Sequence, residues 1–264
     1  MKNDFEIIIK QFDKDITIYP ISDVHLGALE HNSEEWNSFI EKIKNEPNSY
    51  LILNGDLMNN ATRSSVSNVF DDVLRPREQK QRLIEYLTPI KDKILCAVSG
   101  NHERRSGKDA DDDPMYDIMC KLNLEDDYRV NTAFLKIQIG TKREIEKRSC
   151  KTYTLCVTHG AGGGIYTGAS VNRNERFGYT IDGLDCLIVG HTHKGTITKP
   201  SKIVIDPRNN YVSLKEFTVI TTQSWLKFGG YAMQKMLLPS SNANSKCVQK
   251  IILSSREKEI KITW

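Results

Sequence analysis

The sequence predicts an α/β fold in which two packed mixed β-sheets are flanked by α-helices. In the first half of the 264 residues, short apolar runs alternate with segments of helical period, an order typical of parallel strands joined by helices. After Gly195, turn residues separate the apolar runs instead, which indicates strands with few helices. Because no linker rich in Pro, Gly or Ser divides the chain, we expect residues 1–264 to form one domain. The strands of 196–264 are then expected to complete the second sheet of the half formed by 16–195.

Short apolar runs bounded by polar or turn residues give the expected strands. In the first half they cover residues 16–21, 50–53, 94–98, 134–139, 153–157 and 184–189. In the second half they cover 203–205, 217–220, 236–238 and 248–253. Residues 59–72, rich in Ser, Asn and Thr, are interpreted as a loop.

Three helices are expected in the first half. The first is predicted over residues 32–44, and Asn32 and Glu35 at its start resemble a capping box. Pro76 is suited to open the second, and Asp113 to cap the third, which runs to residue 122. The apolar faces are Trp36, Phe39, Ile40 and Ile43 in the first helix, and Leu83, Ile84, Leu87 and Ile90 in the second.

The amino-acid composition is compatible with several kinds of binding partner and excludes few of them. The formal net charge is +3, with both signs spread along the chain, so a nucleic-acid substrate is permitted but not required. The six cysteines show no close pairing, and Cys96, Cys156 and Cys186 lie inside apolar runs, which indicates buried thiols in a reducing compartment. Neither a signal-peptide core nor an apolar stretch of membrane-spanning length occurs. We therefore expect a cytoplasmic protein with no membrane partner.

Five short polar sequence motifs, here called words, each follow an apolar run directly. The words are Asp23-Val24-His25, Gly55-Asp56, Gly100-Asn101-His102-Glu103, Thr158-His159-Gly160 and Gly190-His191-Thr192-His193. In open α/β sheets, functional sites gather beyond the carboxyl ends of the strands. If these strands are neighbours, seven ligands converge: Asp23, His25, Asp56, Asn101, His159, His191 and His193. Seven exceed what one ion needs, whereas two ions sharing the Asp56 carboxylate would use them all.

Taken together, the five words resemble the motif series of the calcineurin-like metallophosphoesterases, which are dimetal phosphoesterases with a four-layer sandwich fold. Every element of that series is present in order from Asp23 to His193. Each word alone is weak, since an aspartate after a strand can be a simple cap and a lone histidine can belong to the core. Their combination in order is specific, and it covers about two thirds of the chain.

The resemblance implies a role for each residue. One metal is held by Asp23, His25, Asp56 and His193, and the other by Asp56, Asn101, His159 and His191. His102 stays off the metals and serves as the catalytic acid for the leaving group, while a hydroxide that bridges the metals attacks phosphorus. Mixed nitrogen and oxygen ligands suit two divalent ions, manganese first, with Fe, Zn, Ni or Co as alternatives.

One branch of this family, the Ser/Thr protein phosphatases, carries an Asp and an Arg where this chain has Asn59 and Asn60. The loss of both favours phosphodiesters of nucleotides or nucleic acid, including a nuclease activity, over phosphoproteins. The alternatives are a phosphomonoesterase for small molecules or phosphoproteins and, ranked last, a non-catalytic scaffold subunit. No ligand of the series is missing, which argues against the scaffold.

Four arginines flank the proposed site and are candidate substrate-binding residues, because a guanidinium group suits phosphate oxygens. They are Arg104, Arg105, Arg173 and Arg176. The aromatic residues past the last word, Trp225, Phe228 and Tyr231, are expected to pack in the core in preference to stacking on a base. His31 has no motif around it and is interpreted as a surface residue.

Overall fold

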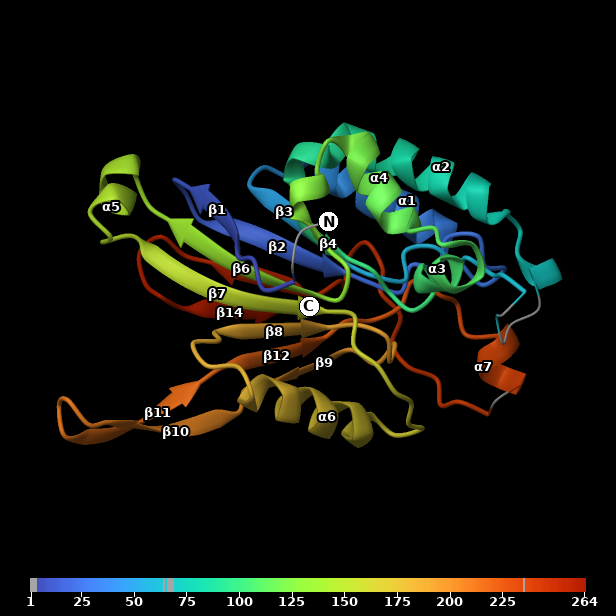
Figure 1. The fold of residues 1–264 in the computed structure, drawn as a ribbon. Coiled ribbons are helices and arrows are strands. Elements are labelled where there is room, and N and C mark those ends of the chain that lie inside the picture. Colours follow the sequence, from blue (N-terminus) through green and yellow to red (C-terminus); the bar gives the residue numbers. More distant parts are fainter. Residues whose placement is uncertain (1–3, 64, 66–68, 235) are drawn as a thin grey trace.

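The computed structural model describes residues 4–63, 65, 69–234 and 236–264. Within these ranges two six-stranded sheets pack face to face, and helices cover the outer face of each (Figure 1). The predicted fold class, two packed mixed sheets flanked by helices, is confirmed. The expected loop at 59–72 contains a 3-10 turn, η1 (Val69–Asp71), and residues 64 and 66–68 of that loop lie outside the described residues.

The first sheet holds the predicted strands at 16–21, 50–53, 94–98 and 248–253. Its order is β14 (Ile260–Thr263), β13 (Lys250–Leu253), β2 (Ile16–Ile21), β3 (Ser49–Asn54), β4 (Ile94–Val98) and β5 (Tyr128–Arg129). From β2 to β5 all neighbours are parallel, whereas β13 runs antiparallel to both β2 and β14. The carboxyl ends of β2, β3 and β4 therefore lie at one edge of this sheet.

The second sheet holds the predicted strands at 134–139, 153–157, 184–189 and 217–220. Its order is β1 (Ile8–Phe12), β6 (Thr132–Ile139), β7 (Lys151–Thr158), β8 (Cys186–Val189), β12 (Thr218–Thr221) and β9 (Thr196–Thr198). Strands β7, β8 and β12 are parallel neighbours. The expectation that residues 196–264 complete the second sheet alone needs correction, because β9 and β12 join this sheet while β13 and β14 extend the first.

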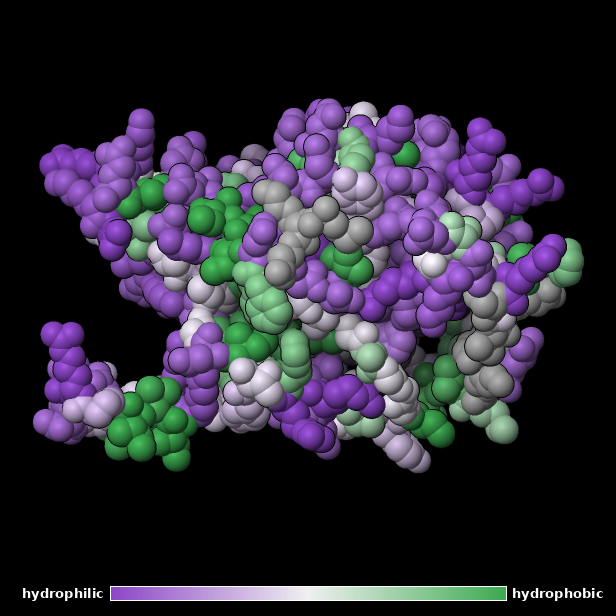
Figure 2. All heavy atoms as spheres, in the orientation of Figure 1, coloured by the Kyte–Doolittle hydropathy of each residue, from purple (hydrophilic) through white to green (hydrophobic). Residues whose placement is uncertain are grey.

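A hairpin of β10 (Ser201–Asp206) and β11 (Tyr211–Glu216) forms a separate two-stranded sheet that projects from the body (Figure 1). The predicted strand at 203–205 lies in it. Its exposed apolar residues appear as the green group on this projection in Figure 2; they include Ile203, Ile205, Val212 and Leu214. The predicted strand at 236–238 is wrong: Met236 lies in a turn and is 84% exposed, so its apolar run meets no strand partner.

The predicted helices are α1 (Ser33–Asn45), α2 (Pro76–Leu87) and α4 (Pro114–Leu122), and all three cover the first sheet (Figure 1). A 3-10 helix, η2 (Thr88–Lys93), continues α2 and buries Ile90. The structure adds α6 (Thr167–Tyr179), which covers the second sheet, as Figure 1 shows. Shorter elements are α3 (Arg104–Ala110), η3 (Glu125–Asp127), α5 (Lys142–Glu146) and α7 (Gly230–Gln234).

Helix capping agrees with the sequence-based prediction at α4 and differs from it at α1. The Asp113 carboxylate caps α4 by accepting a hydrogen bond from the backbone N–H of Tyr116 at 3.0 Å, as predicted. Asn32 makes no such bond at the start of α1, so the expected capping box is wrong. Glu35 instead accepts bonds from the N–H and hydroxyl of Ser245, at 2.9 and 2.8 Å. Its partner lies 210 residues away and holds the C-terminal segment onto α1.

Apolar side chains fill three interfaces between the four layers. Along β2, Tyr19 and Ile21 belong to the cluster under α1, whereas Ile16 and Ile18 belong to the cluster between the sheets. This alternation follows from the two-residue period of a strand. The third cluster lies between the second sheet and α6. Cys96, Cys156 and Cys186 are buried free thiols, as predicted.

The structure has no helix, within the described ranges, whose length and apolar character would allow it to cross a membrane.

Trp36 anchors the cluster under α1. It is fully buried, and its ring lies 5.2 Å from that of Trp225 and 6.0 Å from that of Phe39. We expect Trp36→Ala to lower the free energy of unfolding by about 3–5 kcal/mol, because it leaves a large cavity. Urea denaturation measures this change. Leu29→Ala, at a site 68% exposed, is the control and should change it by less than about 0.5 kcal/mol; equal effects would contradict the packing role.

Candidate metal centre

The loops that carry the five polar words meet at one edge of the molecule, beyond the carboxyl ends of β2, β3, β4, β7 and β8. Backbone hydrogen bonds join these loops directly. The N–H of Asp23 donates to the carbonyl of Gly55 at 3.1 Å, and that of His25 donates to the carbonyl of Asp56 at 3.0 Å. The N–H of Gly190 donates to the carbonyl of His159 at 3.0 Å, which links the second sheet's loops in the same way.

Asp23, His25 and His193 form the first ligand group. Their ligand atoms all lie within 4.8 Å of one another. His193 Nε2 is 3.1 Å from both Asp23 Oδ1 and His25 Nε2. Asp23 Oδ1 is buried and accepts no hydrogen bond of good geometry from the described residues. A buried carboxylate oxygen that faces two imidazole nitrogens without such a bond fits a metal cation.

Asp56, Asn101, His159 and His191 form the second group. His159 Nε2 lies 3.1 Å from Asp56 Oδ2 and 3.2 Å from Asn101 Oδ1. His191 Nδ1 lies 2.6 Å from the same Asn101 oxygen. Asp56 also lies within 4.8 Å of His25 and His102, so its carboxylate stands between the two groups. The structure thus brings together all seven ligands that the sequence proposes.

The backbone at these ligands is strained. Asp23, His25, Asp56, His191 and His193 all have φ between 49° and 70°, in the left-handed region. Each non-glycine residue held there costs on the order of 1–2 kcal/mol. Five of the seven ligands share this conformation, which indicates that the loops are shaped to aim side chains and not to maximise stability.

Further hydrogen bonds fix how each ligand points. The second carboxylate oxygen of Asp23 accepts a bond from the N–H of His191 at 2.9 Å, and that of Asp56 accepts one from the N–H of His102 at 2.8 Å. The Nδ1–H of His159 donates to the carbonyl of Asn54 at 2.8 Å, which turns its Nε2 toward Asp56. Such outer contacts orient metal ligands and set the histidine tautomer.

The charges of the site are strongly coupled. Burial alone would lower the pKa of His159, but the Asp56 carboxylate beside it raises that pKa to about 10. Burial would raise the pKa of Asp23, but His193 lowers it to about 2. Burial and the nearby ring of His102 lower the pKa of His25 well below its usual value. The carboxylates are therefore ionised, and a positive charge beside them is favoured.

His102 lies beside this centre and faces it with Nε2, which is 3.7 Å from Asp56 Oδ2. Its Nδ1–H donates to the backbone carbonyl of Asn59 at 2.7 Å. The partner of His102, which the sequence did not identify, is thus a main-chain oxygen. The side chain of Asn59 instead donates to Asp72 at 2.6 Å. A guanidinium N–H of Arg105 donates to His102 Nε2 at 2.9 Å, so this arginine also faces the site.

The other three candidate arginines have different surroundings. Arg104 donates to the carbonyls of Ser99 and Gly100, and Arg173 donates to the carbonyls of Ala161 and Gly163, so both hold loops. Arg176 is exposed on α6. Substrate contact by these three stays a prediction, with Arg105 the best placed of the four.

Glu103 is the site residue whose role the sequence analysis missed. It is fully buried, and its carboxylate accepts three backbone N–H bonds: from Asp56 and Gly100 at 2.9 Å and from Met58 at 3.0 Å. It therefore fastens the loop after β3 to the loop after β4. Burial and the nearby Asp56 raise its pKa to about 7. In the sequence, the only signal for this role was that Glu103 is acidic and directly follows His102 in a motif of candidate ligands.

Two other interpretations are now settled. Trp225 is 1% exposed and packs against Trp36, so its predicted core role is confirmed. Phe228 is 44% exposed, so its expected core packing is wrong, and the side chain of Tyr231 lies outside the described part of the structure. His31 is not a surface residue: it is largely buried, and its Nδ1–H donates to the carbonyl of Val24 at 2.9 Å.

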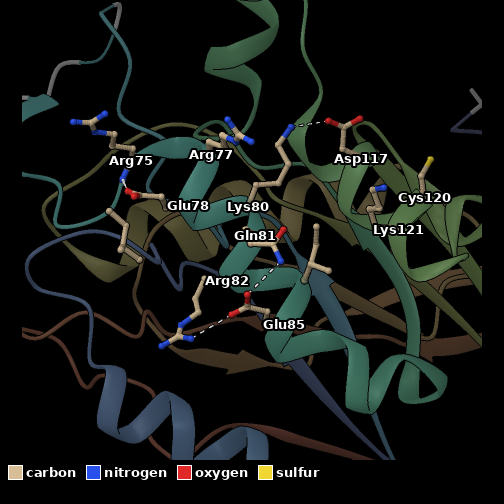
Figure 3. Close-up of a pocket in the computed structure, with 12 residues that line it drawn as sticks. Arg75, Arg77, Glu78, Lys80, Gln81, Arg82, Glu85, Asp117, Cys120 and Lys121 are labelled. Atoms are coloured by element: carbon tan, nitrogen blue, oxygen red, sulfur yellow. Dashed lines mark hydrogen bonds and ion pairs between the residues drawn. The ribbon is translucent and has the colours of Figure 1, made fainter.

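A further cavity lies away from this centre. It is a groove of about 1180 Å³ between α2 and α4 (Figure 3). Charged side chains line it and pair with one another: Lys80 lies 2.6 Å from Asp117, and Arg82 lies 3.2 Å from Glu85. None of the candidate site residues borders it.

We expect Glu103→Gln to lower the free energy of unfolding by about 1–3 kcal/mol and to reduce the bound metal, because an amide nitrogen would face a buried N–H that now has an acceptor. Urea denaturation and elemental analysis of the purified protein measure the two effects. Glu34→Gln, at an exposed glutamate of α1, is the matched control. If Glu103→Gln is as stable and as rich in metal as this control, the loops do not depend on Glu103.

One comparison with known proteins identifies a family for this chain. The family model for calcineurin-like phosphoesterases matches residues 16–195, which include every candidate ligand described above. A solved structure of a conserved uncharacterised protein from Streptococcus pneumoniae TIGR4, described as a predicted phosphoesterase, is similar at 11% identity and a TM-score of 0.36, over 94% of this chain and 88% of that chain. No curated protein matches the sequence. Because the family match covers more than half of the chain, the chain belongs to the calcineurin-like phosphoesterases and is a metal-dependent hydrolase of phosphate esters.

Proposed function

We propose that this chain is a dimetal phosphodiesterase that acts on nucleotides or nucleic acid. The observation that carries the proposal is the convergence of two ligand groups on either side of Asp56, with His102 and Arg105 beside them. Cleavage of a phosphate ester needs groups of these kinds: ligands for cations, a proton donor and a guanidinium for phosphate oxygens.

Two divalent ions, manganese first, fit the two ligand groups. Asp23, His25 and His193 would hold one, and Asn101, His159 and His191 the other, with Asp56 shared between them. When bound, such ions supply an activated water and stabilise the negative charge that develops on the phosphoryl oxygens. Iron, zinc, nickel or cobalt would also suit these mixed ligands.

His102 and Arg105 supply the remaining chemistry. The bond from His102 Nδ1 to the Asn59 carbonyl holds the ring so that Nε2 faces the centre, where it can donate a proton to the leaving oxygen. Arg105 donates to that same Nε2 and to the carbonyl of Asn59. When substrate binds, its phosphate oxygen would take over the guanidinium bond, and Nε2, no longer occupied as an acceptor, would take up a proton from solvent and then donate it to the leaving oxygen.

The surroundings of Asn60 support a diester preference. Its side chain is fully buried and donates to the carbonyl of His102 at 2.7 Å and to the hydroxyl of Ser106 at 3.0 Å. It therefore holds the loop of the catalytic histidine and carries no charge toward phosphate. A monoester has about one more negative charge than a diester at neutral pH, and so gains more from an added cation.

Arg105 is the observation that favours the second candidate, a phosphomonoesterase, because it restores one cation near the centre. A scaffold role ranks last, since all seven ligands are in place. We place the protein in the cytoplasm, as six free cysteines suit a reducing compartment.

We expect His102→Ala to keep its metal but to lose about 10²–10⁴ in kcat on substrates with poor leaving groups, because general acid catalysis is lost. The loss should shrink for p-nitrophenyl esters, whose leaving group needs no proton. Metal content and kcat for an alkyl and a p-nitrophenyl diester measure both effects. A variant without metal would show instead that His102 is a ligand or a structural residue.

The diester preference is tested with bis-p-nitrophenyl phosphate and p-nitrophenyl phosphate, which share a leaving group. At saturating Mn²⁺ we expect kcat/KM to be at least about tenfold higher for the diester, because no arginine stands at Asn60. A monoester advantage would support the second candidate, and inactivity on both would support the scaffold.

A further inference from the structure

A second cavity, of about 580 Å³, adjoins the metal centre on the side of His193. Lys194 and Gly195, which directly follow this ligand, form part of its wall. The hydroxyl of Ser240, from the opposite wall, donates to the carbonyl of His193 at 3.1 Å. The cavity and the first ligand group are therefore linked through one stretch of backbone, which brings the cavity close to the candidate metal centre.

We propose that this cavity binds the nucleobase and sugar of a nucleotide substrate, with the base stacked on Trp264. The proposal rests on the proposed phosphodiesterase function and names its substrate class. A volume of 580 Å³ lies within the range of pockets that bind small molecules, roughly 300–1,000 Å³.

Trp264 supplies a stacking surface. A Cβ atom added at Gly195 would lie 2.8 Å from Trp264 Cη2, so the absence of a side chain there lets the indole lie against the backbone. The residue keeps 47% of its surface exposed while it lines the cavity. Aromatic rings with a free face stack on nucleobases of any sequence.

Two amide side chains in the cavity wall can read the edge of a base. Asn242 is half-buried and has no hydrogen-bond partner among the described residues. The Nε2 of Gln223 donates to the carbonyl of Ser241 at 3.1 Å, which fixes its amide, and no described residue donates to its Oε1. Each base edge carries both donors and acceptors, and carboxamides match such pairs.

The charge of the wall suits the same substrate. Among its lining side chains the one ionised group is Lys194, and none is acidic. Lys194 itself donates to the carbonyls of Gly164 and Ile165, both at 2.6 Å, and so also closes one end of the wall.

The first test compares two p-nitrophenyl diesters at saturating Mn²⁺: the p-nitrophenyl ester of thymidine 5′-monophosphate, and bis-p-nitrophenyl phosphate, which has no nucleoside. We expect Trp264→Ala to raise KM for the nucleoside ester about tenfold or more, with kcat and the kinetics of the other diester within about twofold. Asn242→Ala should act in the same direction, and Trp264→Phe should keep most of the affinity. Equal losses on both diesters would overturn the proposal.

The second test does not depend on turnover. Trp36 and Trp225 are buried, so a stacking ligand would quench chiefly the fluorescence of Trp264. We expect saturable quenching by thymidine 5′-monophosphate that inorganic phosphate does not cause and that Trp264→Phe removes. Phe177→Ala, at an aromatic residue 40% exposed outside the cavity wall, is the control and should retain it. Absence of quenching, or quenching that persists in Trp264→Phe, would overturn the proposal. Quenching without diesterase activity would support the pocket and contradict the proposed function alone.

Discussion

The carboxylate of Glu103 holds the centre together. It accepts three backbone N–H bonds from residues of two loops, those after β3 and β4, and no water reaches it because the side chain is fully buried. Asp56, one of the three donors, keeps a left-handed backbone while its side chain stands between the two ligand groups. An unbonded backbone N–H at Asp56 would cost about 1–3 kcal/mol. The Glu103 carboxylate removes this cost and so stabilises the strained backbone of Asp56.

The same loops explain why the second motif differs from that of the protein phosphatases. Asn60 is buried and holds the carbonyl of His102 and the hydroxyl of Ser106, so its uncharged amide occupies a place where a guanidinium charge would have to be desolvated. The position that carries an arginine in the protein phosphatases is therefore used here to fix the loop of His102. Arg105, three residues past His102, approaches the centre from α3 instead. Asn60 thus positions the loop of His102, whereas Arg105 supplies the positive charge beside it.

Sequence alone predicted which polar side chains converge better than it predicted the frame around them. Asp23, Asp56 and His191 follow parallel buried strands, and the carboxyl ends of such strands must meet at one edge. Strands β1 and β9 were missed, because their residues are half-exposed and lack a clear apolar run. Contacts between residues far apart in the chain could not be predicted from the sequence either. The bond of Glu35 to Ser245 replaced a local cap that the sequence pattern favoured.

The placement of His102 and of the cavity bears on how a substrate would lie. Both His102 and His193 contact His25, with ring centroids 4.4 and 5.1 Å away, and the cavity opens beyond His193. If His102 protonates the leaving oxygen, the leaving group lies on its side of the centre. A nucleoside held against Trp264 is then the part that keeps the phosphate. The two assignments are mutually consistent, because in-line displacement places the leaving oxygen opposite the attacking oxygen and leaves the retained nucleoside on a third, equatorial oxygen of phosphorus.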